Sequence, residues 1–530
     1  MKKLLFYVKI KALMEHVILV LDIGTQSTRA SIVNDKGQIL IIKVEKYATP
    51  YLSPKNGYVE QHPDFYYDAI CKCTKGIAEE RPDLMNQVKS MVIAAFRDTA
   101  CYLDENKNVV RNSVLWLDQR SARLDKKLAW YENLIFALVG MTNTIVFNRK
   151  RTPAIWVQEN EPEIWEKTKH YVPLTTYWNY KLTGELKDSD SNVIGHYPIN
   201  FKKGKWYGKH HYRTHCFQIP LEKLCGLVPC GETIGVITKE ASIETGIPEG
   251  VKLIASGTDK TCEVLGNGVL KNTEAAISYG TACCIDVPSR KYREPEPFLP
   301  AYKAPVKDMY DLEVQIYRGY WMLKWFIQEF AAREKVQARI NSLSVEDLLD
   351  SKILNIEPGC NGLVLQPYWG PGLRRPLARG AIIGFSDSHT KYHIYRAIIE
   401  GITFALREGM ESIQNSTHRK VKSLVVSGGG SKNDIVAQIT ADIFNLPVKK
   451  TETFESCTIG AAMSGFIAEG VFKTPEEAKA SMVRYVKEFT PNPKAAEKYE
   501  ELYKMVYKKL YPKLNKQYGK LKEFSNDEIL

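Results

Sequence analysis

The sequence has no apolar run long enough to cross a membrane, so a membrane partner is not expected. Its 11 cysteines are scattered without a Cys-x-x-Cys pair. This argues against a zinc knuckle or a disulfide framework and predicts reduced thiols in a cytoplasmic protein. No aromatic-basic recognition module accompanies the net charge of +12, so nucleic acid is not an expected partner.

A secretory signal peptide is also not expected. The N-terminal stretch MKKLLFYVKIKALMEHV resembles one, but Lys9 and Lys11 interrupt the apolar run and no small-residue cleavage site follows. We therefore interpret residues 1–15 as an N-terminal extension, and Met14 as an alternative to Met1 for the native start.

What is present is a chain of 530 residues with 44% hydrophobic and 25% charged residues, which predicts a globular protein of at least two large domains. The proline-rich segment 288–305 is the predicted boundary. We expect one domain over 16–288, a second over 289–487 and a helical tail over 488–530. An apolar stripe in the tail predicts a helix docked on the body and stopped at Pro512.

The stretch Val17–Arg29 is the one around which the other motifs can be arranged. Its apolar run predicts a buried strand that ends at the carboxylate of Asp22, followed by a Gly-Thr turn. Such a turn can hold phosphate oxygens through backbone N–H groups, hydroxyls and an arginine, and Asp22 can face magnesium through water. The same letters equally suit an ordinary hairpin. The polar residues concerned are Thr25, Gln26, Thr28 and Arg29.

Two later stretches carry related patterns. Residues 275–287 predict a second hairpin whose turn is Gly280-Thr281, and this echo of the first hairpin suggests a duplicated domain. Residues 423–427 predict a buried strand that meets Gly428 and Gly429, with Asn433 ahead of a helix. Strand, glycine-rich turn and helix is the arrangement in which backbone approaches a nucleotide closely.

Two further strands end in charged residues. Val88–Phe96 runs into Arg97 and Asp98, and a strand from Val251 leads to Asp259. In open α/β sheets, ligands lie at the carboxyl ends of the strands, which makes these side chains candidates for a site. The alternatives are a local Arg97–Asp98 ion pair and an Asp259 that caps the next helix.

Taken together, the motifs resemble those of the FGGY family of carbohydrate kinases over roughly residues 17–487. They are, in order, Asp22-Ile-Gly-Thr-Gln-Ser-Thr-Arg29, Gly257-Thr-Asp259, Gly280-Thr281, the C-terminal signature from Gly380 to Gly401, and Gly428-Gly-Gly-Ser-Lys-Asn433. The resemblance implies an α/β fold of two ribonuclease H-like (actin-like ATPase) domains with a cleft between them.

The resemblance also implies ATP-dependent phosphorylation of a hydroxyl on a ketose, pentulose or glycerol-like polyol. Asp259 would be the general base, and Asp22 and Asp259 would face Mg²⁺. The other implied roles are phosphate binding by Thr25, Gln26, Thr28, Arg29, Gly280 and Thr281, adenosine binding by Gly428, Gly429 and Asn433, and substrate binding by Arg97, Asp98, Asp259 and Lys260.

Some positions depart from the family's pattern. Lys260 follows the catalytic aspartate where a glutamine or small residue is common, and Arg97-Asp98-Thr99 resembles the Arg-Glu-Thr of glycerol kinases. A kinase of another small polyol signal, such as an autoinducer, is an alternative within the same chemistry. A non-catalytic ATP-binding switch of the actin and chaperone type is an alternative outside it. Family members are often dimers, which makes a homodimer an expectation.

Overall fold

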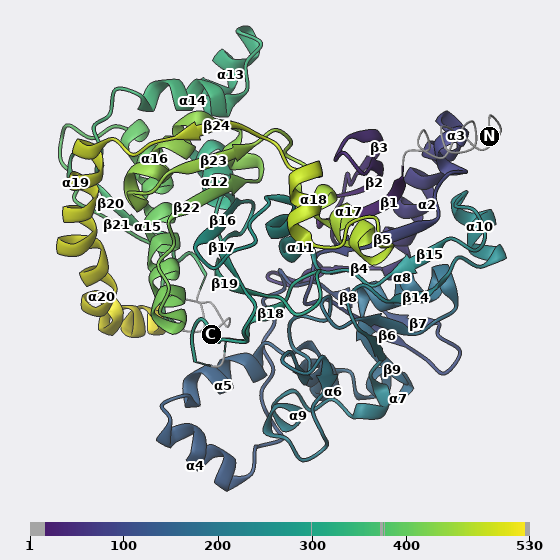
Figure 1. The fold of residues 1–530 in the computed structure, drawn as a ribbon. Coiled ribbons are helices and arrows are strands. Elements are labelled where there is room, and N and C mark those ends of the chain that lie inside the picture. The colour runs from purple at the N-terminus through teal and green to yellow at the C-terminus, as the bar shows by residue number, and fades with distance from the viewer. Residues whose placement is uncertain (1–15, 298, 371–374, 376, 525–530) are drawn as a thin grey trace, which may run out of the picture.

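The structure is a computed structural model that describes residues 16–297, 299–370, 375 and 377–524. The expected N-terminal extension and both candidate start methionines lie outside the described residues. Two large β-sheets stand side by side, each packed with helices (Figure 1). The predicted α/β class with two domains is confirmed.

The first sheet has six strands in the order β14-β15-β5-β1-β2-β3. Their bounds are Thr233–Val236 (β14), Lys252–Ile254 (β15), Ser90–Ala95 (β5), Val17–Ile23 (β1), Ser27–Asn34 (β2) and Ile39–Lys46 (β3). β1, β2 and β3 are antiparallel neighbours, β5 and β15 run parallel to β1, and the edge strand β14 is antiparallel to β15. The apolar β1 is buried along its whole length because helices cover both faces of the sheet.

The second sheet has seven strands in the order β18-β19-β17-β16-β22-β23-β24. Their bounds are Tyr302–Lys303 (β18), Tyr310–Ile316 (β19), Cys283–Ser289 (β17), Glu274–Tyr279 (β16), Ser423–Ser427 (β22), Val448–Thr451 (β23) and Tyr485–Phe489 (β24). The second sheet repeats the strand neighbours and strand directions of the first. The corresponding strands, in order, are β16, β17, β19, β22, β23 and β24 for β1, β2, β3, β5, β15 and β14. The predicted duplication is therefore present in the topology.

The chain passes from the first sheet to the second earlier than the predicted boundary at residue 288. The hairpin of β16 and β17, which we assigned to the first domain, lies in the middle of the second sheet. The proline-rich segment that suggested the boundary begins inside β17 and leads to β18 of the same sheet. Prolines there break up strands within one domain, so they do not mark a linker. The switch falls between Gly266 and Glu274.

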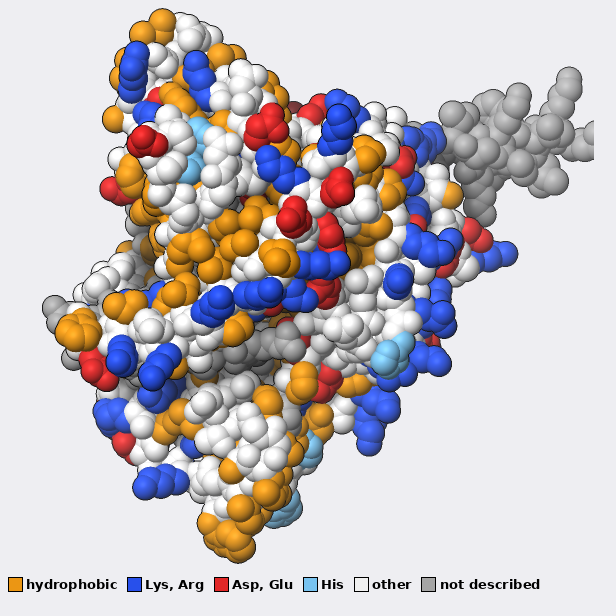
Figure 2. Space-filling view, turned by 90° about the vertical axis from the view of Figure 1, so that its left-hand side faces the viewer, with side chains coloured by type: hydrophobic (Ala, Val, Ile, Leu, Met, Phe, Trp, Pro, Cys, Tyr) orange, Lys and Arg blue, Asp and Glu red, His pale blue; other side chains and the backbone are white. Residues whose placement is uncertain are grey.

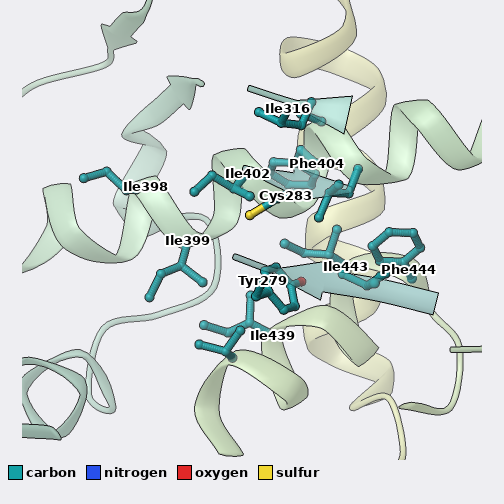
Figure 3. Close-up of a cluster of buried hydrophobic side chains, with 14 of the residues drawn as sticks. Tyr279, Cys283, Ile316, Ile398, Ile399, Ile402, Phe404, Ile439, Ile443 and Phe444 are labelled. Carbon is teal, nitrogen blue, oxygen red and sulfur yellow. The ribbon is translucent and has the colours of Figure 1, made fainter. Parts of the chain in front are cut away.

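One face of each sheet is covered by helices of its own domain. On the first sheet these are α2 (Pro63–Glu80), α8 (Leu174–Thr183) and α10 (Lys239–Thr245). On the second they are α12 (Trp321–Phe330), α15 (Lys391–Thr417) and α16 (Asp434–Phe444). Figure 3 shows Ile439 of α16 beside Tyr279 at the end of β16, with Ile402 and Phe404 of α15 in the same cluster.

Between the two sheets lie α11 (Asp259–Gly266) and α17 (Ser456–Ala468). α17 comes from the second half of the chain but packs on the first sheet, with Met463 and Phe466 in one cluster with Ile18 and Val92. The two helices meet through reciprocal glycines. A Cβ on Gly266 would lie 1.8 Å from the carbonyl oxygen of Ser456, and a Cβ on Gly460 would lie 1.8 Å from that of Cys262. No other residue permits this approach.

Shorter elements complete the chain. Beside the first sheet they are β4 (Glu60–Gln61), α3 (Pro82–Met85), β6 (Ala100–Leu103), β7 (Val109–Arg111), β8 (Ser113–Val114), α4 (Trp130–Leu138), α5 (Thr142–Lys150), α6 (Pro153–Asn160), α7 (Pro162–Lys167), β9 (His170–Pro173), β10 (Lys187–Ser189), β11 (Ile199–Asn200), β12 (Lys205–Trp206), α9 (Tyr212–Phe217) and β13 (Gly226–Val228). Beside the second they are α13 (Ala332–Ile340), α14 (Val345–Ile353), β20 (Val364–Gln366), β21 (Ala381–Ile383) and α18 (Pro475–Met482). Figure 2 shows hydrophobic side chains at the lower tip of the molecule, where Figure 1 places α4.

The tail forms α19 (Pro493–Leu502), a π-helical turn over Tyr503–Tyr507, and α20 (Lys508–Leu521). Its stripe packs on the second domain as predicted, because Tyr499, Tyr503 and Tyr507 are at most 1% exposed. The predicted stop at Pro512 is wrong, since this proline lies inside α20. A helix can continue through proline where the backbone before it is irregular, as the π-helical turn is here.

None of the helices among the described residues combines the length and the apolar composition that a membrane span requires.

Candidate active site

The carboxyl ends of the central parallel strands of each sheet bring the predicted motifs together. In the first sheet Ile23 of β1 is level with Ala95 of β5, so the turn at Gly24 lies beside Arg97. In the second, Ser278 of β16 is level with Ser427 of β22, so Gly280 lies beside Gly428. Strand register therefore gathers residues that are far apart in the sequence, as strand ends do in open sheets.

Asp22 and Arg29 are directly opposite each other on β1 and β2, and Arg29 Nη1 lies 3.4 Å from Asp22 Oδ2. The alternation of the strands points both side chains to the face of the sheet that carries α11 and α17. Glu455, the residue before α17, places its Oε2 3.4 Å from Arg29 Nε. Burial raises the pKa of Asp22 to about 6, and nearby Asp259 and Glu455 add to this effect while Arg29 opposes it.

Asp259 opens α11 but does not cap it. The cap is Thr258, whose hydroxyl accepts from the N–H of Thr261, so the alternative that made Asp259 the capping residue is wrong. The only hydrogen bond of the Asp259 side chain among the described residues is from the N–H of Lys260 at 2.8 Å. Burial raises the pKa of this carboxyl, with Lys260 and Arg97 lowering it in part. A carboxylate of raised pKa with free acceptor sites can accept a proton from a ligand.

The side chain of Lys260 turns away from Asp259 toward the second sheet. Its Nζ donates to Ser278 Oγ at 2.8 Å and to Glu263 Oε2 at 3.0 Å. Burial alone would lower the pKa of Lys260, but Glu263 raises it well above its usual value. A Cβ on Gly280 would lie 3.6 Å from this Nζ. Lys260 thus lies beside the second Gly-Thr turn, whereas we had predicted it in the sugar site.

Arg97 and Asp98 do not pair with each other, so the local ion pair that we weighed for them is absent. Arg97 pairs with Glu313 of β19 in the second sheet. Its Nη1 is buried without a hydrogen-bond partner among the described residues. Asp98 has φ +57° and accepts from the backbone N–H of His196 at 3.0 Å, with the ring Nδ1 at 2.8 Å. Burial would raise the pKa of Asp98, but His196 outweighs it and lowers the value.

Among the predicted nucleotide residues, Thr25, Gln26, Thr281 and Gly429 are partly or well exposed. Gly428 has φ +83°, and a Cβ there would lie 2.9 Å from the carbonyl oxygen of Tyr279. The amide of Asn433 has structural partners: its oxygen caps α16 through the N–H of Ile435, and its nitrogen donates to Asp350 Oδ2 at 2.6 Å. Asn433 therefore fixes the end of the glycine turn where α16 begins.

Thr28 does not reach the cleft. It is fully buried, and its hydroxyl lies 2.5 Å from that of Tyr47. The reason is strand alternation, since Thr28 shares the α2 side of β2 with Ala30 and Ile32 while Arg29 faces the other side. The prediction that Thr28 contacts the nucleotide is therefore wrong.

A pocket of about 590 Å³ is lined by residues of both domains. Its walls include Trp116, whose indole N–H donates to Thr25 Oγ1 at 2.9 Å. Sequence reasoning found Asp98 in this pocket but missed the residues that complete it. They lie in loops and short elements without a periodic signal, and they include Trp116, Arg151, His196, Tyr317 and Arg318.

Comparisons with known proteins agree with this architecture. The FGGY family of carbohydrate kinases matches with its N-terminal domain over residues 17–266 and with its C-terminal domain over residues 275–469. Xylulose kinase of Lactococcus lactis subsp. lactis is 28% identical over 491 residues, which cover 91% of this chain and 94% of that protein.

Two solved structures from Lactobacillus acidophilus share the fold. A ligand-bound xylulose kinase has a TM-score of 0.78 at 22% identity and covers 95% of this chain and 99% of its own. A gluconate kinase also has a TM-score of 0.78 at 22% identity and covers 96% of this chain and 100% of its own. The fold therefore does not distinguish between a neutral ketose and a sugar acid.

Proposed function

The chain belongs to the FGGY family of carbohydrate kinases, and from this premise we propose that it transfers the γ-phosphoryl group of ATP to a hydroxyl of a sugar or polyol bound in the interdomain pocket. The observation that carries the proposal is the convergence of Asp22, Asp98 and Asp259 at neighbouring strand ends of the first sheet, opposite the glycine turns of the second. Phosphoryl transfer requires this positioning and charge neutralisation more than covalent help from the protein.

Asp259 is the proposed general base. The substrate hydroxyl oxygen attacks the γ-phosphorus, the bond to the ADP oxygen breaks, and the hydroxyl proton passes to the carboxylate. The free acceptor capacity of Asp259 and its raised pKa support this role, because proton uptake is then less costly than at an ordinary aspartate.

The two Gly-Thr turns are proposed to hold the phosphate chain from opposite sides. Thr25, Gln26 and Arg29 approach from the first domain, and Gly280 and Thr281 from the second, with Lys260 Nζ beside Gly280 as an additional cation. Gly428 and Gly429 would lie against the adenosine. Gly428 supports this, since its backbone passes close to the end of β16 in a conformation that other residues rarely adopt.

Mg²⁺ fits the acidic end of the first sheet. The buried Asp22 lies close enough to Asp259 and Glu455 for both to raise its pKa, and Arg29 only partly offsets this negative charge. A hard divalent cation is the natural complement of such oxygens. Asp22 and Asp259 would hold it, through water, and the ion would supply neutralisation of phosphate charge.

The substrate hydroxyls are proposed to bind Asp98 and the unpartnered Nη1 of Arg97. His196 keeps Asp98 ionised and oriented, and Glu313 fixes Arg97, so both side chains are held in place before a sugar arrives. Polar groups at fixed positions discriminate strongly between sugars, because a missing hydroxyl leaves them unpaired.

All 11 cysteines of the sequence are free thiols, which supports the cytoplasm as the place of action.

The test is ADP release from MgATP against a panel of ketoses, polyols, sugar acids and glycerol. Release that depends on one compound and is lost in Asp259→Asn, with ATP binding retained, supports the proposal. ATP binding without compound-dependent release would contradict it and favour a non-catalytic switch. Release only with a polyol signal of the autoinducer type would keep the mechanism and change the substrate.

A further inference from the structure

Two arginines face the pocket from opposite domains. Arg151 stands between α5 and α6 of the first domain, and Arg318 follows β19 of the second. Both line the pocket near the turns that are proposed to hold phosphate. Trp116 joins its wall to Thr25, and two residues after Arg318 the N–H of Tyr320 donates to the carbonyl oxygen of Gly280.

Neither arginine has a carboxylate partner among the described residues. Arg151 has only the carbonyl oxygen of Asp118 at 3.5 Å and the ring of Phe147, and Arg318 has only the ring of Trp321. Arg120, on the same wall, is by contrast neutralised. It makes two hydrogen bonds of 2.8 Å to Asp118 and lies 2.8 Å from Glu60.

The other acid of the pocket does not compensate for these charges. Asp98 is already held by His196. Burial lowers the pKa of Arg151 and of Arg318. The charge of Asp118 partly offsets this effect at Arg151, and the like charge of Arg318 adds to it. Two partly buried cations without an ion-paired carboxylate are costly unless an anion binds between them.

The first turn of α6 adds to the preference for an anion. Thr152, the residue before the helix, and Pro153, its first residue, both line the pocket, so the positive end of the helix faces into it. Pro153 has no N–H, so this helix end lacks one donor of the backbone cradle that phosphates usually receive. A pair of guanidinium groups matches the planar, bidentate geometry of a carboxylate.

We propose that the substrate is a sugar acid, and that Arg151 and Arg318 bind its carboxylate while Asp98 and Arg97 bind its hydroxyls. This inference rests on the proposed kinase activity and narrows it to an anionic substrate class. Because the two arginines come from different domains, the carboxylate also links the two walls of the cleft.

The test compares acids with neutral sugars of the same chain length: gluconate with glucitol, and xylonate with xylulose. We expect kcat/KM for the preferred acid to exceed that of its neutral partner about 100-fold. Arg151→Gln and Arg318→Gln should each raise the KM for the acid about 10-fold with little change in kcat, and should leave the neutral sugar unaffected. Arg151→Lys and Arg318→Lys should recover part of the loss.

Arg123→Gln is the matched control, because Arg123 is an exposed arginine that pairs with Asp125 away from the pocket. A neutral sugar as the best substrate, with equal losses on acids and neutral sugars in both glutamine variants, would overturn the inference and leave the arginines a structural role. Preference for a phosphorylated sugar over the acid would also overturn it.

Isothermal titration of the acid without ATP separates this inference from the proposed function. If no compound releases ADP, the kinase proposal fails. Acid binding that is lost in the two glutamine variants but kept in Arg123→Gln still supports the carboxylate site. No acid binding to the wild type overturns it.

Discussion

The two sheets share one topology but carry different chemistry at their strand ends. In the first, β1, β5 and β15 lead to Asp22, Asp98 and Asp259. In the second, the matching strands β16 and β22 lead to Gly280 and Gly428. In the proposed mechanism one copy therefore presents carboxylates for a metal ion, a sugar and a proton, and the other presents backbone for a nucleotide. Equivalent positions in a repeated fold can divide the two substrates of one reaction between them.

The contact between α11 and α17, which joins the two domains, is symmetric, whereas the chemistry at the strand ends is not. α11 follows β15, α17 follows β23, and each helix has a glycine against the other's backbone. Close approach of two helices depends on shape alone, so both copies retain it, whereas the loops are free to diverge.

The largest expected effect tests the carboxylates at the strand ends of the first sheet. Asp259→Asn should lower kcat about 1,000-fold because it removes the proton acceptor while preserving the shape. ATP affinity should change little. The measurements are ADP release and nucleotide titration on the same preparation. A variant that keeps most of the wild-type kcat would show that the first sheet does not supply the base.

The matching test of the proposed nucleotide site in the second sheet is Gly428→Ala. The new Cβ would meet the backbone of Tyr279 and would require a strained positive φ, at a cost of about 1–3 kcal/mol. We expect ATP affinity to fall about 10-fold or more, measured by titration, with a lower Tm. Gly208→Ala is the control, since its Cβ would meet nothing within 4 Å and it lies outside the proposed nucleotide site. An equal loss of ATP affinity in that control would contradict the assignment of Gly428.

The junction is tested by Gly460→Ala and Gly266→Ala. Each Cβ would collide with a backbone carbonyl, and we expect a loss of about 3 kcal/mol in unfolding free energy. The double variant should cost less than the sum, because the first change already separates the helices. Denaturant unfolding measures this. Gly208→Ala, in open space, is the control. Additive losses would mean that the two contacts are independent.

The smallest expected effect concerns Asp350, an acid of the second domain that does not take part in the proposed reaction. Burial raises the pKa of Asp350 from 3.8 to about 6. Its folded pKa exceeds the unfolded value, so its stabilising contribution is complete below pH about 4 and is lost as the pH rises through about 6. Asp350→Asn should therefore be more stable than wild type at pH 8 and equal to it at pH 4. Urea unfolding at both pH values provides the check, and an equal difference at both would contradict it.

Much of the architecture could be predicted from local pattern. The strands β1, β5, β16 and β22 were predicted correctly because each is a continuous apolar run in the sequence. Errors arose where a local signal had more than one structural meaning. The proline-rich segment 288–305 marks a break inside the second sheet and not a domain boundary, and Pro512 lies inside the tail helix α20.

The candidate site was predictable only where a motif lies at a strand end. Asp22, Asp98 and Asp259 were found in this way. Thr28 was included wrongly, since a linear motif does not show which face of β2 a side chain takes. Arg151 and Arg318 were missed because they lie in irregular segments of different domains and meet only across the cleft.

Local patterns were sufficient to predict the central strands, the turns that follow them and the family, because these depend on residues close together in the chain. The packing of the two domains was needed to show that Lys260 faces the second sheet, that Arg97 is fixed by Glu313, and that two arginines share one pocket. Such facts depend on the register of strands and the docking of two domains. The contacts that set them join residues from 18 positions apart, as for Lys260 and Ser278, to 216 positions apart, as for Arg97 and Glu313, and no local pattern records them.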